Sequence, residues 1–325
     1  MSLKCVSPLT AWRSKDVNEA TGKRSLVFRK DLAIDDESLT IRCGRCIRCR
    51  LHRSAMWAVR CTHEAKMHKH NSFLTLTYDN ENIPWDMSVH VREVQLFMKR
   101  LRKRLGNTHK KIKYFLCGEY GELNRRPHYH VLLFGYDYPD KKFFKTSGKG
   151  KDKNPLYISD LLQKDWGKGH CFIGDVTFNS AAYVARYVVK KVVGKDLHKA
   201  KPQKFDGYSV DLTPYQYFDA NTGQVFDISP EFVTMSNGIG KSWFMKNRGD
   251  VFPHDKVVVN GRALKPPRYY DLIEKEVDNQ VWLEVEAKRE SSEFLLDNPE
   301  TYELRCRNTA AEASYNKTYT RNIGD

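Results

Sequence analysis

The fold of this chain is decided by the stretch Pro127-His128-Tyr129-His130-Val131-Leu132-Leu133-Phe134. Its aromatic and branched apolar residues predict a strand over His128–Gly135. Because successive side chains of a strand point to opposite faces of a sheet, His128 and His130 share one face, and the residues that alternate with them share the other. Two imidazoles on one rigid face are well placed to bind a divalent metal ion. The alternative is a pair of partly exposed strand histidines without a metal.

Further strands and helices are predicted around this stretch. Apolar residues spaced i, i+3, i+4 and i+7 predict an amphipathic helix from Val91 to Leu105. Lys111–Gly118 is typical of a strand, and the turn-rich segment Glu119–Pro127 joins it to the histidine strand. The same reasoning predicts strands over Ser72–Tyr78 and Cys171–Val176, helices over Ser54–His70, Ser159–Trp166 and Ser180–Val193, and a loop over Asp140–Pro155. This order predicts an α+β fold, with an antiparallel sheet backed by helices.

Three parts are expected along the 325 residues. Residues 1–53 are polar, mostly irregular, and end in a cysteine cluster. Residues 54–194 contain the predicted sheet and its helices. Residues 195–325 are expected to form a β-containing extension, with a hairpin at Asn221-Thr222-Gly223 and an acidic helical tail.

A carboxylate close to the two histidines would complete a metal site. Glu119 ends the strand that we expect to pair antiparallel with the histidine strand, whereas Glu122 lies in the turn, where its side chain is aimed less well. One Glu and two His leave coordination positions free for water and a phosphate oxygen. We therefore predict that Glu119, His128 and His130 are the metal ligands.

The helix predicted at Ser180–Val193, with Asn179 or Ser180 as its N-cap, carries two tyrosines. Tyr183 and Tyr187 are four residues apart and therefore project from one helical face. A tyrosine hydroxyl is a covalent nucleophile once a base, a cation or a metal-polarised target activates it. The alternative is a pair of core tyrosines on an amphipathic helix.

Three cysteines stand in Cys43-Gly44-Arg45-Cys46-Ile47-Arg48-Cys49, too close together for three ordinary disulfides. Because the N-terminus has no apolar signal segment, this cluster indicates metal binding in a reducing compartment. Tetrahedral zinc needs a fourth ligand, for which Cys5, His52 and Cys61 are candidates. An iron–sulfur cluster of the ferredoxin kind is disfavoured because no Cys-Pro follows. Three free thiols are the remaining alternative.

The charge of the chain indicates a polyanionic partner. The formal net charge is +15, and residues 271–304 hold eleven acidic against three basic residues, so the rest of the chain is more basic still. A basic body is typical of proteins that bind nucleic acid. No apolar run approaches the roughly 20 residues of a membrane-spanning helix, so we expect no membrane partner. Gly238-Ile239-Gly240-Lys241-Ser242 is not a P-loop, because Met235 stands where that motif needs glycine.

Three stretches, in order, resemble the motifs of the HUH endonucleases. They are FLTLTY (Phe73–Tyr78), PHYHVLLFG (Pro127–Gly135) and YVARYVVKK (Tyr183–Lys191). The form with two tyrosines and following lysines is similar to the rolling-circle replication initiators of small single-stranded DNA phages. CGRCIRC (Cys43–Cys49) and GEYGELNRRPHYH (Gly118–His130) resemble the gokushovirus-type initiators of the Microviridae. The resemblance covers about residues 43–191.

The resemblance implies a ferredoxin-like or RRM-like HUH core and a metal-dependent endonuclease that nicks and rejoins single strands. It implies that Mg²⁺ or Mn²⁺ at the predicted triad polarises the scissile phosphate. Tyr183 or Tyr187 then attacks, leaving a 3′-OH primer and a 5′-phosphotyrosine. The resemblance also implies that Lys190 and Lys191 stabilise phenolate or phosphate charge, and that Cys5 is the fourth ligand of a structural zinc.

The partners implied are single-stranded or supercoiled phage origin DNA, a host helicase and a host DNA polymerase, in the cytoplasm of the host bacterium. Two alternatives remain. One is a non-enzymatic, zinc-stabilised protein that binds single-stranded DNA or RNA. The other is a plasmid-type relaxase or mobilisation protein, although relaxases usually place the tyrosine near the N-terminus.

Overall fold

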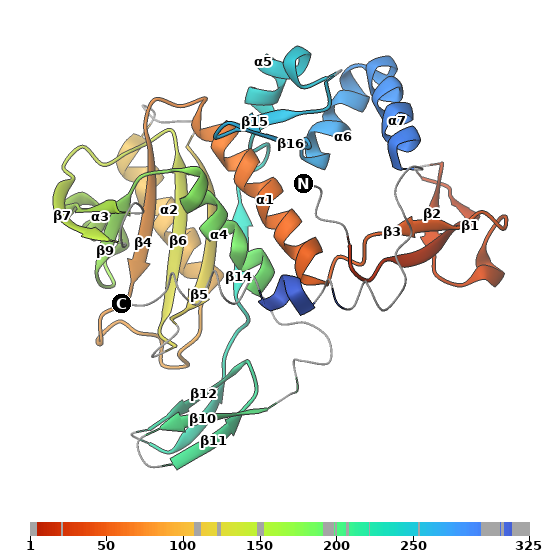
Figure 1. Cartoon of the computed structure of the whole chain (residues 1–325). Helices are drawn as coiled ribbons and strands as arrows, with labels where there is room; N and C mark the ends of the chain where they lie inside the picture. Colours follow the sequence, from red (N-terminus) through yellow and green to blue (C-terminus); the bar gives the residue numbers. More distant parts are fainter. Residues whose placement is uncertain are drawn as a thin grey trace. The chain divides into compact units, whose positions relative to one another are not determined.

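A computed structural model gives the structure of the chain. It describes residues 5–20, 22–106, 112–121, 125–147, 153–190, 198, 200–205, 208–220, 222–252, 254–293, 306 and 309–313. The chain divides into two compact units, Met1–Arg53 with Glu290–Asp325, and Ser54–Arg289 (Figure 1). The three-part division predicted from the sequence stays a prediction.

The second unit is built on a seven-stranded sheet in the order β14-β5-β6-β4-β9-β8-β7. Each neighbouring pair is antiparallel, which confirms the predicted α+β class. The strands are β4 (Asn71–Thr77), β5 (Lys113–Tyr120), β6 (Pro127–Phe134), β7 (Lys142–Ser147), β8 (Asn154–Ile158), β9 (Cys171–Gly174) and β14 (Phe232–Met235). β14 comes from the region expected to form a C-terminal extension and pairs with β5 at the edge of the sheet.

The loop predicted over Asp140–Pro155 is wrong, because β7 and β8 form a hairpin that extends the sheet. Every residue of β7 is exposed, so the strand has no buried face and shows no apolar alternation in its sequence. Pairing with β8, rather than local periodicity, forms this strand.

One face of the sheet is covered by α1 (Ile47–Ala65) and α4 (Phe178–Lys190), which lie in front of it in Figure 1. The part of α1 after residue 53 and the whole of α4 pack on alternate residues of β5 and β6. The buried residues are Ala58, Cys61, Phe115, Cys117, Leu132, Phe134, Ala181, Val184, Ala185 and Ile239. Because His128 and His130 alternate in step with Leu132, both histidines lie on the α4 face.

The opposite face carries α2 (Val91–Leu105) and α3 (Asp160–Trp166). The bounds of α2 are those predicted from its apolar spacing. Its buried stripe is Val94, Phe97, Met98 and Leu101. Burial of each such side chain contributes about 1.5–3 kcal/mol to stability. This face is therefore a packed core, and the chemical residues lie on the other.

Helix α4 begins earlier than its sequence predicts. Thr177 Oγ1 accepts the Ser180 N–H at 3.1 Å, and Ser180 Oγ accepts the Thr177 N–H at 2.8 Å. This reciprocal pair makes Thr177 the N-cap, so the predicted cap at Asn179 or Ser180 is wrong. The earlier start places Tyr183 in the second turn.

Shorter elements complete the second unit. The hairpin predicted around Asn221-Thr222-Gly223 is confirmed by the antiparallel pair of β12 and β13. The helical character predicted for the acidic region is confirmed by α6 and α7. These elements are β10 (Lys201–Phe205), β11 (Tyr208–Leu212), β12 (Gln216–Asp219), β13 (Gln224–Asp227), α5 (Lys241–Val251), β15 (Val257–Val259), β16 (Arg262–Leu264), α6 (Arg268–Val277) and α7 (Asn279–Glu293).

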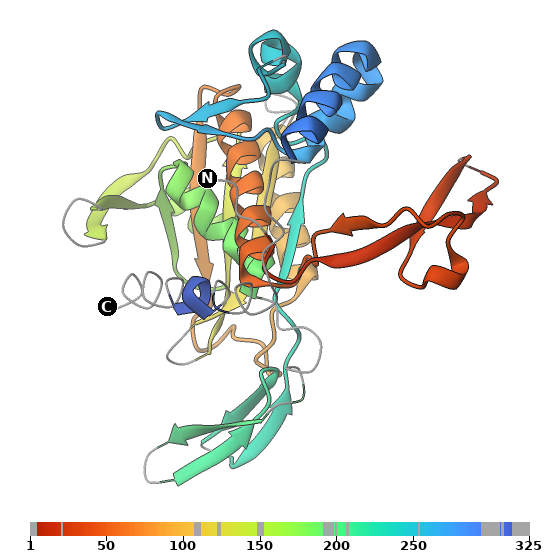
Figure 2. The same cartoon turned by 45° about the vertical axis from the view of Figure 1, so that its right-hand side comes forward.

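The first unit contains a three-stranded antiparallel sheet, in the order β2-β1-β3, drawn in red tones in Figure 2. Its strands are β1 (Leu9–Asn18), β2 (Lys23–Val27) and β3 (Leu39–Ile41), with a 3₁₀ turn at Lys30–Leu32. The irregular N-terminal segment predicted from the sequence is therefore wrong. Most side chains of β1 are exposed, so burial imposes little pattern on the sequence.

Candidate metal centre and nucleophile

The register between β5 and β6 brings Glu119 to the histidines. Glu119 stands directly opposite His128, and Cys117 stands opposite His130. The antiparallel pairing predicted for these two strands is thus confirmed. Because opposite residues of an antiparallel pair project from the same face, all three polar side chains meet on the α4 face.

Glu119 Oε1 lies 3.0 Å from His128 Nε2 and 2.7 Å from His130 Nε2. The three potential ligand atoms lie within 4.8 Å of one another. Glu119 is 2% exposed and His130 is 6% exposed, while His128 is partly accessible. A buried carboxylate and two imidazole nitrogens therefore converge on a site that remains open beside His128.

Both imidazole rings are held from behind. His128 Nδ1 lies 3.1 Å from the carbonyl oxygen of Arg126, which accepts its N–H. His130 Nδ1 lies 3.1 Å from Thr75 Oγ1, and Thr75 stands directly opposite His130 in β4. Partners of this kind fix the ring and leave Nε2 as the ligand atom.

The carboxyl group of Glu119 is held in its charged form. Burial acts to raise its pKa, but hydrogen bonds from His128 and His130, together with their positive charge, lower the pKa of Glu119 to about 2. The group is therefore an anionic ligand throughout the neutral pH range.

Tyr183 reaches this triad from α4. Its hydroxyl lies 3.4 Å from Glu119 Oε1 and 3.4 Å from His130 Nε2. Its ring meets the His130 ring at 84° with centroids 5.0 Å apart. The guanidinium carbon of Arg186 lies 5.2 Å from the Tyr183 ring centre. A hydroxyl, a cation and the triad thus share one site.

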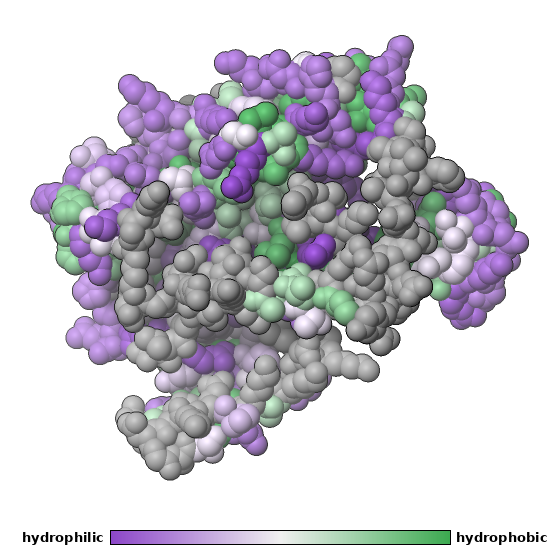
Figure 3. All heavy atoms as spheres, viewed as in Figure 1, coloured by the Kyte–Doolittle hydropathy of each residue, from purple (hydrophilic) through white to green (hydrophobic). Residues whose placement is uncertain are grey.

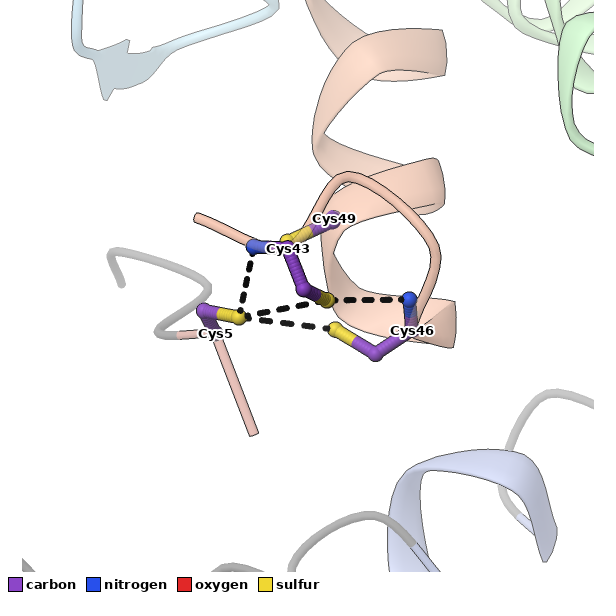
Figure 4. A group of neighbouring side chains, drawn as sticks. All are labelled: Cys5, Cys43, Cys46 and Cys49. Atoms are coloured by element: carbon purple, nitrogen blue, oxygen red, sulfur yellow. Dashed lines mark hydrogen bonds between the residues drawn. The ribbon is translucent and has the colours of Figure 1, made fainter. Parts of the chain in front are cut away.

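A second cluster lies in the first unit, where four cysteines converge (Figure 4). Cys5 Sγ lies 3.5 Å from Cys43 Sγ and 3.9 Å from Cys46 Sγ. Cys49 lies in the first turn of α1, and all four sulfur atoms fall within 4.8 Å of one another. Zn–S bonds of about 2.3 Å in a tetrahedron separate sulfur atoms by about 3.8 Å, so this spacing suits a tetrahedral ion.

Backbone N–H groups point at the sulfur atoms. The Cys43 N–H donates to Cys5 Sγ at 3.4 Å, and the Cys46 N–H donates to Cys43 Sγ at 3.3 Å. Burial acts to raise the pKa of Cys46, but donors that include the N–H groups of Val6 and Cys49 lower it to about 7. Such donors stabilise thiolates, which are the form that binds a metal. Of the other candidates, Cys61 is fully buried in the core under α1.

Comparison with known proteins connects the triad and the helix to phage replication. Residues 71–192, from β4 to the end of α4, match the family model of the replication-associated protein ORF2. The chain is 31% identical over 294 residues to replication-associated protein VP4 of Bdellovibrio phage phiMH2K, covering 88% of this chain and 82% of that protein. It is 32% identical over 275 residues to replication-associated protein ORF2 of Spiroplasma virus 4, covering 81% and 76%. The chain belongs to this family of phage replication-associated proteins.

A further member of the family, replication-associated protein ORF4 of Chlamydia phage 1, is 29% identical over 287 residues, covering 87% of this chain and 63% of that protein. The family resemblance noted in the sequence motifs is thereby confirmed. No solved structure matches the chain. Within the described ranges, no helix combines the length and the apolar character that crossing a membrane requires.

Some predicted site residues of this replication-associated protein are less fully described. Tyr187 and Lys190 lie in α4, one and two turns after Tyr183, and the structure describes their backbone only. Lys191 and the rival ligand Glu122 lie outside the described residues. Their roles stay predictions.

Sequence reasoning missed three residues that contact the triad or the tyrosine. Thr75 bonds His130, the Phe73 ring stacks on His130 with centroids 5.5 Å apart, and Arg186 lies over the Tyr183 ring. The signal was present, since Phe73 and Thr75 alternate within FLTLTY and Arg186 stands inside YVARYVVKK.

The Gly238–Ser242 stretch, which lacks a complete P-loop motif, has a structural role. The Gly240 N–H donates to Glu64 Oε2 at 2.7 Å, so a carboxylate of this chain occupies the position where a phosphate-binding loop would hold its ligand.

Proposed function

We propose that the chain initiates phage DNA replication by nicking one DNA strand with Tyr183 and later rejoining it. The observation that carries this proposal is the position of the Tyr183 hydroxyl, 3.4 Å from both Glu119 Oε1 and His130 Nε2. A core tyrosine would bury its hydroxyl against neutral partners, whereas this one faces a set of metal-ligand atoms.

The donor set fits a divalent cation. Two ring nitrogens point at a single carboxylate oxygen, which is the arrangement that a cation replaces when it displaces the two Nε2 protons. When bound, Mg²⁺ or Mn²⁺ at Glu119, His128 and His130 would polarise the scissile phosphate and offset its charge in the transition state. Thr75 and the Arg126 carbonyl keep both rings in the required orientation.

The covalent step proceeds by displacement at phosphorus. The Tyr183 hydroxyl loses its proton, its oxygen forms a bond to phosphorus, and the bond from phosphorus to the 3′ oxygen breaks. The leaving oxygen takes up a proton and becomes a 3′-OH that can prime synthesis, while the 5′ end stays joined to tyrosine. Attack by a 3′-OH on this phosphotyrosine reverses the step, so rejoining needs no nucleotide cofactor.

Positive charge next to the tyrosine supports the ionised nucleophile. Arg186 lies one helical turn after Tyr183, with its guanidinium carbon 5.2 Å from the ring centre. In this proposal Tyr187 is a second nucleophile that acts while Tyr183 is occupied, and Lys190 and Lys191 neutralise phosphate charge.

The four cysteines are proposed to hold a structural zinc. The sulfur spacings of 3.5 and 3.9 Å and the two backbone N–H···S bonds favour this assignment. The ion would join Cys5 to a cysteine cluster 38 residues away. Its contribution would therefore be to the folding of the first unit.

The proposal includes the partners and the cellular site. The substrate is single-stranded or supercoiled phage origin DNA, a host helicase opens the duplex, and a host DNA polymerase extends the primer in the bacterial cytoplasm. The net charge of +15 and the replication-associated names of the relatives support a DNA substrate.

The test is incubation with single-stranded phage origin DNA and Mn²⁺ or Mg²⁺, followed by mass spectrometry of the covalent peptide. We expect a DNA adduct on the peptide that contains Tyr183 or Tyr187, and none with the double variant Tyr183→Phe, Tyr187→Phe. Tyr217→Phe, which changes a half-buried tyrosine of β12, is the matched control and should cleave as the wild type does.

Two results would overturn the proposal. An adduct formed by the double phenylalanine variant would remove the assignment of the nucleophile. A wild-type protein that binds origin DNA but never cleaves it with either metal would instead support the non-enzymatic binding protein. His128→Ala should lose nicking while retaining affinity for DNA, because the change removes a ligand and leaves the surrounding surface intact.

A further inference from the structure

The free edge of the seven-stranded sheet carries aromatic and basic side chains that the proposed chemistry does not use. All residues of β7 are exposed, and Phe143 and Phe144 are 63% and 48% exposed. In Figure 3 a group of hydrophobic side chains lies at the left of the molecule, where Figure 1 places β7. Two adjacent exposed phenylalanines on an edge strand indicate a binding surface.

The two phenylalanines lie on different faces. Phe143 stands opposite Tyr157, which packs against the core under α2 and α3, and their rings meet at 82° with centroids 6.2 Å apart. A bulge follows, after which Phe144 contacts Phe172 of β9, with ring centroids 5.6 Å apart and planes 30° apart.

Phe172 connects this edge to the metal triad. Thr75 of β4 stands opposite His130 on one side and opposite Phe172 on the other. The residues His130, Thr75, Phe172 and Phe144 therefore form a row across the triad face. Strand spacings of about 4.8 Å place β7 about 19 Å from β6, which is a distance that several nucleotides span.

A lysine accompanies the aromatic pair. Lys145 Nζ lies 5.7 Å from the centre of the Phe144 ring. The surrounding segment, residues 141–153, holds six lysines and one aspartate. Aromatic rings that stack on bases, next to cations that contact phosphates, are the combination that binds single-stranded nucleic acid.

We propose that Phe144, Phe172 and Lys145 form a binding surface for single-stranded DNA, which extends from the triad to the edge of the sheet. This inference rests on the proposed function, since the strand it binds is the one that Tyr183 cuts. Bases stack on the two rings and a phosphate contacts Lys145. Because every base has a π-face, the surface accepts any sequence and holds the strand while it is nicked and rejoined.

The test measures binding of a fluorescein-labelled dT 12-mer by anisotropy, with the full chain carrying Tyr183→Phe so that no adduct forms. We expect Phe144→Ala to weaken binding by about 5- to 100-fold, the range for loss of one stacked base. Phe143→Ala is the matched control on the other face and should change the affinity less than twofold. Phe144→Trp should retain binding because it keeps the stacking ring.

The lysine is tested through salt dependence. Each phosphate contact with a single strand contributes about 0.7 to the slope of log K against log salt concentration. Lys145→Gln should reduce that slope by about 0.7. Lys141→Gln should leave it unchanged, since Lys141 lies over Tyr157 on the other face, 5.0 Å from its ring centre.

Several results would overturn the proposal: equal affinity of Phe144→Ala and the parent, equal losses in Phe143→Ala and Phe144→Ala, or tighter binding of rU than of dT. A dimer in sedimentation that Phe144→Ala dissociates without a change in DNA affinity would assign the edge to a second copy of the chain. These failures are distinguishable from failure of the proposed function, which is scored separately by the covalent adduct of a chain with Tyr183 intact.

Discussion

Thr75→Val tests whether the support behind the metal ligands determines metal affinity. Valine has almost the shape of threonine but lacks the hydroxyl, which lies 3.1 Å from His130 Nδ1. Since Thr75 stands directly opposite His130 in β4, the change removes this one contact without altering the ligand set. The strand itself should persist, because valine is well suited to β structure.

The expected effect on metal binding exceeds the expected effect on stability. Loss of a partner behind a ligating histidine costs about 10- to 100-fold in metal affinity, or about 1.4–2.8 kcal/mol. An ordinary hydrogen bond contributes a net of about 0.5–1.5 kcal/mol to folding, and the added methyl group offsets part of this loss. Metal affinity and unfolding free energy should therefore separate clearly.

The assay is titration of the metal-free protein with Mn²⁺, followed by electron paramagnetic resonance of the free ion. The matched control is Thr77→Val on the same face of β4, whose hydroxyl donates to the His170 carbonyl at 2.7 Å. Thr75→Val should shift the Mn²⁺ dissociation constant at least tenfold, and Thr77→Val less than threefold. Unchanged Mn²⁺ affinity in Thr75→Val would refute the idea that Thr75 orients His130.

Three other predictions concern single side chains. Arg186→Gln should slow formation of the DNA adduct about 2- to 30-fold in quenched-flow experiments, because a cation close to the Tyr183 ring contributes about 0.5–2 kcal/mol. Cys46→Ser should lose bound zinc as measured by mass spectrometry of the metal, whereas the exposed Cys306, changed to Ser, should retain it. Burial, aided by the charge of Lys66, lowers the pKa of His63 to about 3, so His63 stays neutral in the folded chain while the unfolded chain binds a proton below about pH 6.5. Denaturant titrations should therefore show about 1.4 kcal/mol of unfolding free energy lost per pH unit between about 6.5 and 3, and a smaller slope in His63→Phe.

Local periodicity made the centre of the sheet predictable. The period-2 pattern of β6 places both histidines on one face, and the i, i+3, i+4 spacing of α2 gives its bounds. Edge and surface elements were not predictable in the same way. The strands β1 and β7 are mostly exposed, so burial imposes no alternation on them, and their existence depends on pairing with β2, β3 and β8.

The sequence by itself determined the α+β class, the common face of His128 and His130, and the ordered motifs of a phage replication-associated protein. These features depend on neighbours in the chain, which local spacing records. Only the tertiary structure decided that Glu119 stands opposite His128, that Thr75 supports His130, and that the Tyr183 hydroxyl reaches both ligands. Such contacts depend on strand register and on the packing of α4 over β5 and β6, because a shift of one residue would turn every one of these side chains to the other face.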